Sequence, residues 1–239
     1  MEVPPSRTYM EFAAVEPEFP MTDGMKRQTI IDALLTLLAS EPLDRIGLDD
    51  VARAAGISLA DLRDEFPSIV AILSAHMKDI DRKVLAGDAS DMDEEPARER
   101  LFDVLMRRLD AHAGHKAAIR SLMRSTMCNP PLALVMNGLA ARSMSWMMTA
   151  AGISAAGAKG ALRAQALTLM YVRVLSVWAN DEDPGLARTM AALDRELARA
   201  ERWSGMLDTL LAIPERLQAG RWRARRRRDP NPDDDIVAA

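Results

Sequence analysis

The stretch Leu48–Phe66, LDDVARAAGISLADLRDEF, constrains the fold more than any other part of the chain. Its apolar and alanine positions fit one face of a first short helix, and Gly56 follows as a natural left-handed helix stop. Ser58 can cap a second short helix, because its side-chain oxygen accepts from the free N–H groups of a first turn. Small residues before the glycine let the two helices cross closely. The stretch therefore predicts a helix-turn-helix that ends at Phe66.

The composition of the chain favours helix elsewhere too. Ala, Leu, Met and Arg are abundant, whereas Val, Ile, Tyr and Phe are scarce, and the abundant group contains the strongest helix formers. With 239 residues, 49% of them apolar, the chain can bury one large helical core or a small one and a larger one. We predict an all-α protein.

Charge and cysteine content exclude several classes of protein. The net charge of −4 provides no global basic field, so any nucleic-acid binding must come from a local patch. The single Cys128 excludes an internal disulfide and a cysteine-rich metal site, and it suits a reducing compartment. No leader-like segment or apolar run of about 18 residues is present, and we expect a cytoplasmic protein. No phosphate loop, metal-ligand cluster or nucleophile–base pair is recognisable, and we expect no enzyme activity, cofactor or metal.

Composition shifts divide the chain into four parts. Prolines and scattered acids over 1–22 predict a flexible arm. The helix-turn-helix head is expected over 23–67. Helical periodicity over 68–219 predicts a larger body, and 220–239 is an Arg-rich, then acidic tail.

The pattern from Ile30 to Leu73 resembles the DNA-binding head of TetR-type transcriptional regulators. The resemblance rests on the apolar face of the first helix, the LDDVARAAGIS turn, and Phe-Pro-Ser at 66–68 before an apolar helix. It implies a TetR-like fold, with an N-terminal three-helix head and a larger helical ligand-binding and dimerisation body. It also implies a DNA-binding regulator, a repressor, that acts as a homodimer on a double-stranded DNA operator and responds to a small apolar effector.

Carried over by position, the resemblance assigns DNA contacts to residues of the first three helices and the turns before them. These residues are Lys26, Arg27, Gly47, Ser58, Leu59, Ala60, Asp61 and Arg63. The second short helix and the stretch after it depart from the family pattern, because Glu65 stands where a histidine is usual and Ile69, after Phe-Pro-Ser, where a lysine is usual. From Gly24 to Leu85 ten acids outnumber eight bases, which opposes attraction to phosphate.

The body holds candidates for an apolar ligand pocket. A helix from about 132 to 151 is apolar all round, which is typical of a helix buried in a bundle. The predicted pocket residues are Met106, His112, Met123, Met127, Met136, Trp146, Met147, Met170 and Tyr171. A solid methionine-rich core is the competing interpretation, and the i, i+3 pair of His112 and His115 is a weak metal signal without an acidic or cysteine partner.

The two helices that follow show a coiled-coil-like seam, since apolar residues step by four and three along the second of them. The resemblance places a four-helix dimer interface there. The predicted interface residues are Leu162, Leu169, Arg173, Val177, Leu186, Met190, Leu193 and Leu197. Packing within one chain is the competing interpretation.

The C-terminal end supports a second functional hypothesis. Residues 203–228 combine an apolar helix face with an arginine cluster, a pattern that suits weak contact with an anionic membrane. The chain is also loosely similar to the TetR-fold lipid- and quinone-binding accessory proteins of ubiquinone biosynthesis, which no longer bind DNA and use a C-terminal amphipathic segment at membranes. A segment packed on the body with a solvated tail is the simpler interpretation.

Overall fold

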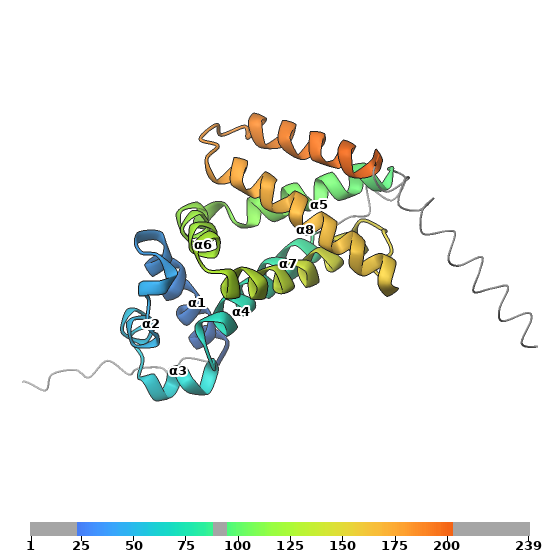
Figure 1. The fold of residues 1–239 in the computed structure, drawn as a ribbon. Coiled ribbons are helices and arrows are strands. Elements are labelled where there is room, and N and C mark those ends of the chain that lie inside the picture. Colours follow the sequence, from blue (N-terminus) through green and yellow to red (C-terminus); the bar gives the residue numbers. More distant parts are fainter. Residues whose placement is uncertain (1–22, 88–94, 203–239) are drawn as a thin grey trace, which may run out of the picture.

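The computed structural model describes residues 23–87 and 95–202, and within these ranges all regular structure is helical. Figure 1 shows a small head at one end and a larger helical body at the other. The predicted arm over 1–22 and the predicted membrane-contact and tail segments over 203–239 lie outside the described residues.

The head is built from one long helix and three short ones, packed around one apolar cluster. They are α1 (Asp23–Ser40), the 3-10 helix η1 (Leu43–Arg45), α2 (Leu48–Ala55) and α3 (Leu59–Glu65). The buried cluster contains apolar residues of all four elements and reaches into the next helix and the body, with Ile30, Leu34, Leu38, Leu43, Val51, Leu62, Phe66, Ile72 and Ala118 among its members.

Local signals set the helix ends of the head. Gly56 closes α2 with a φ of +67°, in the left-handed region that L side chains rarely adopt. The Ser58 hydroxyl accepts from the Asp61 N–H at 3.0 Å, and the Ser68 hydroxyl accepts from the Ala71 N–H at 3.2 Å. The predicted helix-turn-helix is confirmed in its helices and in its turn.

The body consists of the helices that follow. They are α4 (Ile69–Leu85), α5 (Ala97–Ala111), the 3-10 helix η3 (Ala113–His115), α6 (Lys116–Cys128), α7 (Pro130–Ala150) and α8 (Gly157–Ala179). A last helix begins at Ala187 and continues to 202, where the described chain ends. None of the described helices combines the length and the hydropathy that a membrane crossing requires.

Two helices connect the head to the body. The first half of α4 contributes Ile72 and Leu73 to the head cluster, and its second half contributes Ile80 and Val84 to the body cluster. Helix α6 packs along α1 on one side and contacts α7 and α8 on the other. Helices α4 and α6 therefore contact both the head and the body.

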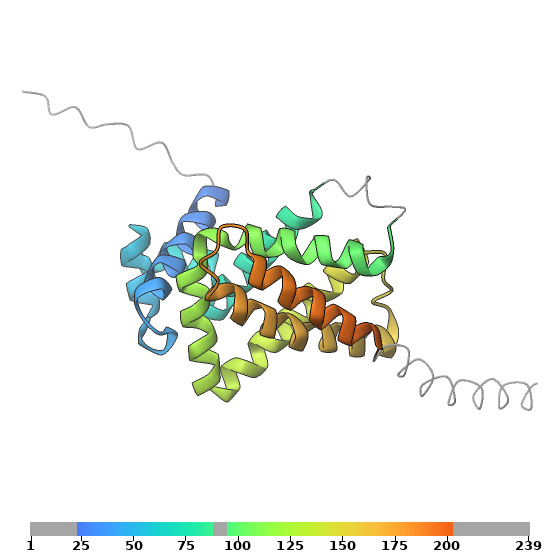
Figure 2. The ribbon, with the colours of Figure 1, turned by 90° about the horizontal axis from the view of Figure 1, so that it is seen from above.

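The last helix packs against both α5 and α8, as Figures 1 and 2 show. Arg98 of α5 donates to Asp194 at 2.5 Å, and Arg173 of α8 donates to Glu196 at 3.4 Å. At its start the Asp181 carboxylate accepts from both the N–H and the hydroxyl of Thr189, at 2.9 and 2.6 Å. The helix is thus fixed to its own chain at its start and near its middle.

Helix α7 is not buried all round, which corrects the sequence-based interpretation. Ser143, Met144, Met147 and Met148 are buried, but Leu134 is 74% exposed and Trp146 is 54% exposed. Helix α7 lies at the outside of the bundle, with α4 and α8 covering one side of it. Hydropathy alone does not distinguish a helix with two covered faces from one whose second face is open.

Candidate nucleic-acid interface

The outer surface of α3 is the candidate interface, and its inner surface holds it in place. Leu62 and Phe66 are buried in the head cluster, while Leu59, Ala60 and Arg63 are exposed. Leu59 is 55% exposed although it is apolar. Buried anchors behind exposed small, apolar and cationic residues give the helix a rigid reading face, of the kind that enters a DNA groove.

Two predicted phosphate contacts are already paired with acids of α3. Arg27 of α1 donates to the Glu65 carboxylate at 3.0 Å and to the Glu65 carbonyl at 3.1 Å, and its guanidinium lies 4.4 Å from the Phe66 ring centre. Lys26 lies 3.8 Å from the Asp61 carboxylate. These pairs fix α3 against α1 and partly neutralise both cations.

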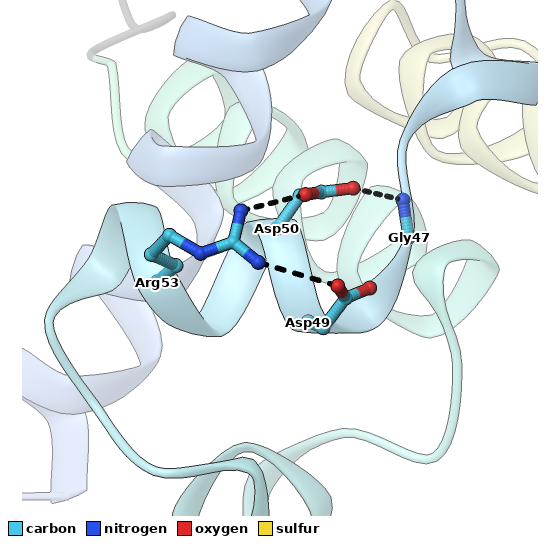
Figure 3. A network of polar contacts seen from close by, with 4 residues as sticks. All are labelled: Gly47, Asp49, Asp50 and Arg53. Atoms are coloured by element: carbon cyan, nitrogen blue, oxygen red, sulfur yellow. Dashed lines mark hydrogen bonds and ion pairs between the residues drawn. The ribbon is translucent and has the colours of Figure 1, made fainter.

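The first turn of α2 has a similar arrangement, shown in Figure 3. Arg53 donates to Asp50 at 2.9 Å and to Asp49 at 3.3 Å, and the other oxygen of Asp50 accepts from the Gly47 N–H at 2.9 Å. That backbone hydrogen bond and Arg53 hold the pKa of Asp50 below its usual value. Gly47, a predicted DNA contact, has no side chain, and its backbone caps α2 through this N–H and through its carbonyl, which accepts from the Val51 N–H at 3.2 Å.

The polar residues at the start of α3 bond to one another. The Ser58 hydroxyl donates to the Asp61 carboxylate at 2.5 Å, and this hydrogen bond together with the nearby Lys26 lowers the pKa of Asp61. Arg63, the cation of α3, is exposed and makes no ion pair with any residue that the structure describes. Its guanidinium is available for guanine or for phosphate.

The predicted pocket residues divide into two groups. His112, Met147, Met170 and Tyr171 are buried in the body core, and Met106 and Met123 pack against it. The other three lie elsewhere: Met136 packs against the head cluster, and Met127 and Trp146 are 84% and 54% exposed. Six of the nine predicted residues therefore lie in or against the body core.

The arrangement of these helices is similar to that of solved structures. A TetR transcriptional regulator from Nitrosomonas europaea matches 73% of this chain and 97% of its own, with 24% identity and a TM-score of 0.58. A TetR transcriptional regulator from Rhodococcus sp. RHA1 matches 75% and 97%, with 19% identity and a TM-score of 0.52. The chain has the TetR regulator fold. Its sequence matches no family model and no curated protein.

The TetR-like body exposes part of the predicted dimer surface. Leu162, Leu169 and Arg173 are exposed on α8, Met190 is exposed on the last helix, and Val177 and Leu186 are partly covered. Leu193 and Leu197 are buried in the core of their own chain and offer no surface to a partner. Of the predicted seam on the last helix, Leu193 and Leu197 therefore pack inward, whereas Met190 remains on the surface.

Sequence reasoning missed the buried ion pair of the TetR-like body. Arg108 of α5 is 2% exposed and pairs with Asp81 of α4, whose carboxylate also accepts from the Ser143 hydroxyl at 2.6 Å. Burial raises the pKa of the adjacent Tyr171 to about 12, and the charge of Arg108 opposes that rise. Asp81 lies three residues before the buried Val84, and residues three apart share one face of a helix, so the spacing indicates an acid near the inner face.

His76 was missed as well. The chain has three histidines, and the structure gathers all of them where α4, α5 and η3 meet. The His76 ring centre lies 5.7 Å from that of His112 and 5.6 Å from that of His115. The signal was available, because His76 lies at i+4 from the apolar Ile72 and at i−4 from Ile80.

An open groove of about 730 Å³ separates the head from the body on one side. Two serines of α6 that line the groove bond to the head. The Ser125 hydroxyl accepts from the Leu43 N–H at 3.1 Å, and the Ser121 hydroxyl donates to the Glu41 carbonyl at 2.9 Å. These hydrogen bonds fasten the η1 region of the head to α6.

Proposed function

We propose that the protein is a dimeric DNA-binding transcriptional regulator, a repressor, whose affinity for its operator depends on a small effector in the body. One observation carries the proposal: α3 presents Leu59, Ala60 and Arg63 outward from a TetR-like head in which Leu62 and Phe66 anchor the helix. In a dimer, two such helices enter successive major grooves about 34 Å apart.

The charge pattern indicates how such a regulator would bind. Phosphate contacts supply most non-specific affinity, and their number sets the salt dependence. Lys26, Arg27 and Arg53 are paired with acids, so they contribute less to phosphate binding than free cations would. We therefore propose weak non-specific binding and a larger share of base contacts, with Arg63 on guanine and the Leu59 side chain on a thymine methyl group.

The exposed apolar residues of α8 support the dimer. Leu162, Leu169 and Val172 are each between 45% and 53% exposed and recur at helical spacing along α8. Large apolar side chains that recur along one exposed helix face are typical of a protein interface. We propose that this surface of α8, with Met190 beside it on the last helix, meets the second copy.

Fluorescence anisotropy with labelled duplexes from the DNA upstream of the protein's own gene tests the proposal. The wild type is expected to bind a subset of these duplexes in a salt-dependent way. Arg63→Ala is expected to weaken that binding by about tenfold or more, because one bidentate base contact contributes about 1–3 kcal/mol. Arg142→Ala, an exposed arginine on α7, is the control. Equal, weak binding to every duplex would reject the regulator.

The paired cations favour one alternative, a TetR-fold lipid- or quinone-binding accessory protein that no longer binds DNA. In that function the body would hold the lipid, and residues 203–228 would contact the membrane. Flotation with anionic liposomes compares the full chain with one that ends at residue 203. The alternative requires that only the full chain floats, and equal behaviour of the two chains would reject it.

A further inference from the structure

Three aromatic rings meet inside the body, each from a different part of the fold. They are His76 of α4, His112 at the end of α5, and Trp178 of α8. The His112 ring centre lies 5.7 Å from that of His76 and 6.4 Å from that of Trp178. Trp178 is fully buried and His112 is 6% exposed. We call these three residues the ring cluster.

Every member of the ring cluster carries a buried nitrogen without a hydrogen-bond partner among the described residues. These atoms are Nε2 of His76, Nδ1 of His112 and Nε1 of Trp178. The nearby Tyr171 hydroxyl and the Nε atoms of Arg98, Arg107 and Arg108 also lack such a partner. Five other buried polar side chains do have partners, namely Ser121, Ser143, Thr168, Asp181 and Thr189. Unpartnered buried polar atoms destabilise a fold, and three in one place indicate a site that a bound group completes.

The ring cluster offers hydrogen bonds but no free charge. Burial lowers the pKa of His76 to about 4 and holds that of His112 well below its usual value, so both imidazoles are neutral at pH 7. The buried Arg108 is neutralised by Asp81, and Lys116, 5.0 Å from the Trp178 ring centre, donates to the Asp181 carbonyl at 2.8 Å. An indole N–H only donates, whereas a neutral imidazole can donate or accept.

A metal ion fits the ring cluster poorly. Among the described residues, no group of histidine, cysteine, aspartate and glutamate side chains is arranged to hold one. The third member is an indole, which is a donor and has no lone pair for a metal. The surrounding core instead contains Met144, Met147 and Met170, whose flexible side chains adapt to the shape of an apolar guest.

We propose that the ring cluster recognises an uncharged, flat apolar molecule through a hydroxyl or carbonyl oxygen on it. The apolar part would displace methionine side chains, and the oxygen would bond to His112 and to the Trp178 N–H. The inference rests on the proposed function only in calling this molecule the effector. Because the rings come from α4, α5 and α8, its binding would act directly on α4, which continues into the head.

Isothermal titration calorimetry of the full chain, without DNA, tests the inference with three matched probes. Naphthalene has the ring system alone, 2-naphthol adds a neutral hydroxyl, and 2-naphthoate adds a negative charge. The wild type is expected to bind 2-naphthol about tenfold more tightly than naphthalene, as one buried hydrogen bond allows. Equal affinity for the two, tighter binding of 2-naphthoate, or no binding of 2-naphthol would overturn it.

Two histidine variants locate the hydrogen bond. His112→Phe keeps a ring and removes the unpartnered nitrogen, so the preference for 2-naphthol over naphthalene is expected to disappear. His115→Phe makes the same change three residues later, at a partly exposed position, and is expected to keep the preference. If His112→Phe does not fold, Trp178→Phe replaces it. A preference that survives both cluster variants, or zinc binding that depends on His112, would contradict the inference.

The DNA experiment remains separate from the probe experiment. Loss of the 2-naphthol preference with intact DNA binding would overturn only the inference. A confirmed preference in a protein without DNA binding would leave the inference standing and reject the regulator.

Discussion

Two acids of the head each form an ion pair with one cation, and these pairs distinguish it from a strongly basic head. Asp61 and Glu65 lie on the helix that would face DNA, yet each is directed back to a cation of α1. The same contacts that hold α3 in place therefore reduce the positive charge available to phosphate. At these two positions, the contacts that stabilise the head also weaken its attraction to DNA.

Removing both acids is expected to strengthen non-specific DNA binding. Asp61→Asn with Glu65→Gln frees Lys26 and Arg27, and the slope of log affinity against log salt is expected to steepen by about 2. Anisotropy with an unrelated duplex between 50 and 200 mM salt measures it. Asp110→Asn with Glu182→Gln changes the net charge equally on exposed body positions and is expected to leave the slope unchanged. A slope that steepens in both variants would show a global charge effect instead.

Gly56 is the residue on which the turn between α2 and α3 depends. A Cβ added there meets no atom within 4 Å, so the cost of Gly56→Ala comes from its φ of +67° alone, about 1–2 kcal/mol of unfolding free energy. Gly138 of α7 is also open on all sides but helical, and Gly138→Ala is expected to stabilise by about 0.5–1 kcal/mol. Urea unfolding of both variants measures these opposite signs, and a shared sign would contradict the backbone argument.

At the scale of elements, a buried ion pair between Asp81 and Arg108 joins α4 to α5. Asp81→Asn leaves the Arg108 charge buried without its partner and is expected to cost about 3–5 kcal/mol of unfolding free energy. Asp79→Asn, two residues earlier on α4, breaks a pair with an Arg82 side chain that is 75% exposed and is expected to cost less than about 1 kcal/mol. Chemical denaturation compares the two. Similar losses would mean that the buried pair contributes no more than the exposed one.

The histidines between α4 and α5 make stability depend on pH. The folded-state pKa of His76, about 4, lies below its unfolded value of 6.5, so the unfolded chain binds more protons between these values. The contribution of a neutral His76 is fully present above pH 6.5 and is lost as the pH falls toward 4. The loss reaches about 3 kcal/mol at most. Denaturation at pH 7.0, 5.5 and 4.5 is expected to show a shallower decline for His76→Gln than for the wild type, and parallel curves would contradict this assignment.

At the scale of the whole molecule, the exposed α8 surface should determine the oligomeric state. Leu169→Lys places a charge in the proposed interface, where its desolvation is expected to raise the dimer dissociation constant by at least about tenfold. Met127→Lys makes the same change at an 84% exposed position on α6 and is expected to leave the dimer intact. Sedimentation equilibrium measures both. A monomeric wild type, or a dimer that tolerates Leu169→Lys, would reject this surface.

The sequence by itself determined the features that depend on neighbouring residues. Gly56, Ser58 and Ser68 end or begin their helices through hydrogen bonds within four residues and through one backbone angle, so their roles could be predicted directly. The helical fold and the helix-turn-helix followed from the same local causes. The TetR resemblance then predicted the head-and-body architecture of the part of the chain that the structure describes.

Only the tertiary structure decided which surfaces remain open and which polar groups meet. Lys26 and Asp61 are 35 residues apart and Arg27 and Glu65 are 38 apart, so their pairing depends on how α1 packs against α3. The same holds for the open face of α7, the buried part of the seam on the last helix, and the ring cluster drawn from three helices. A periodic pattern shows that a helix has an apolar face, but the packing of its neighbours determines what covers that face.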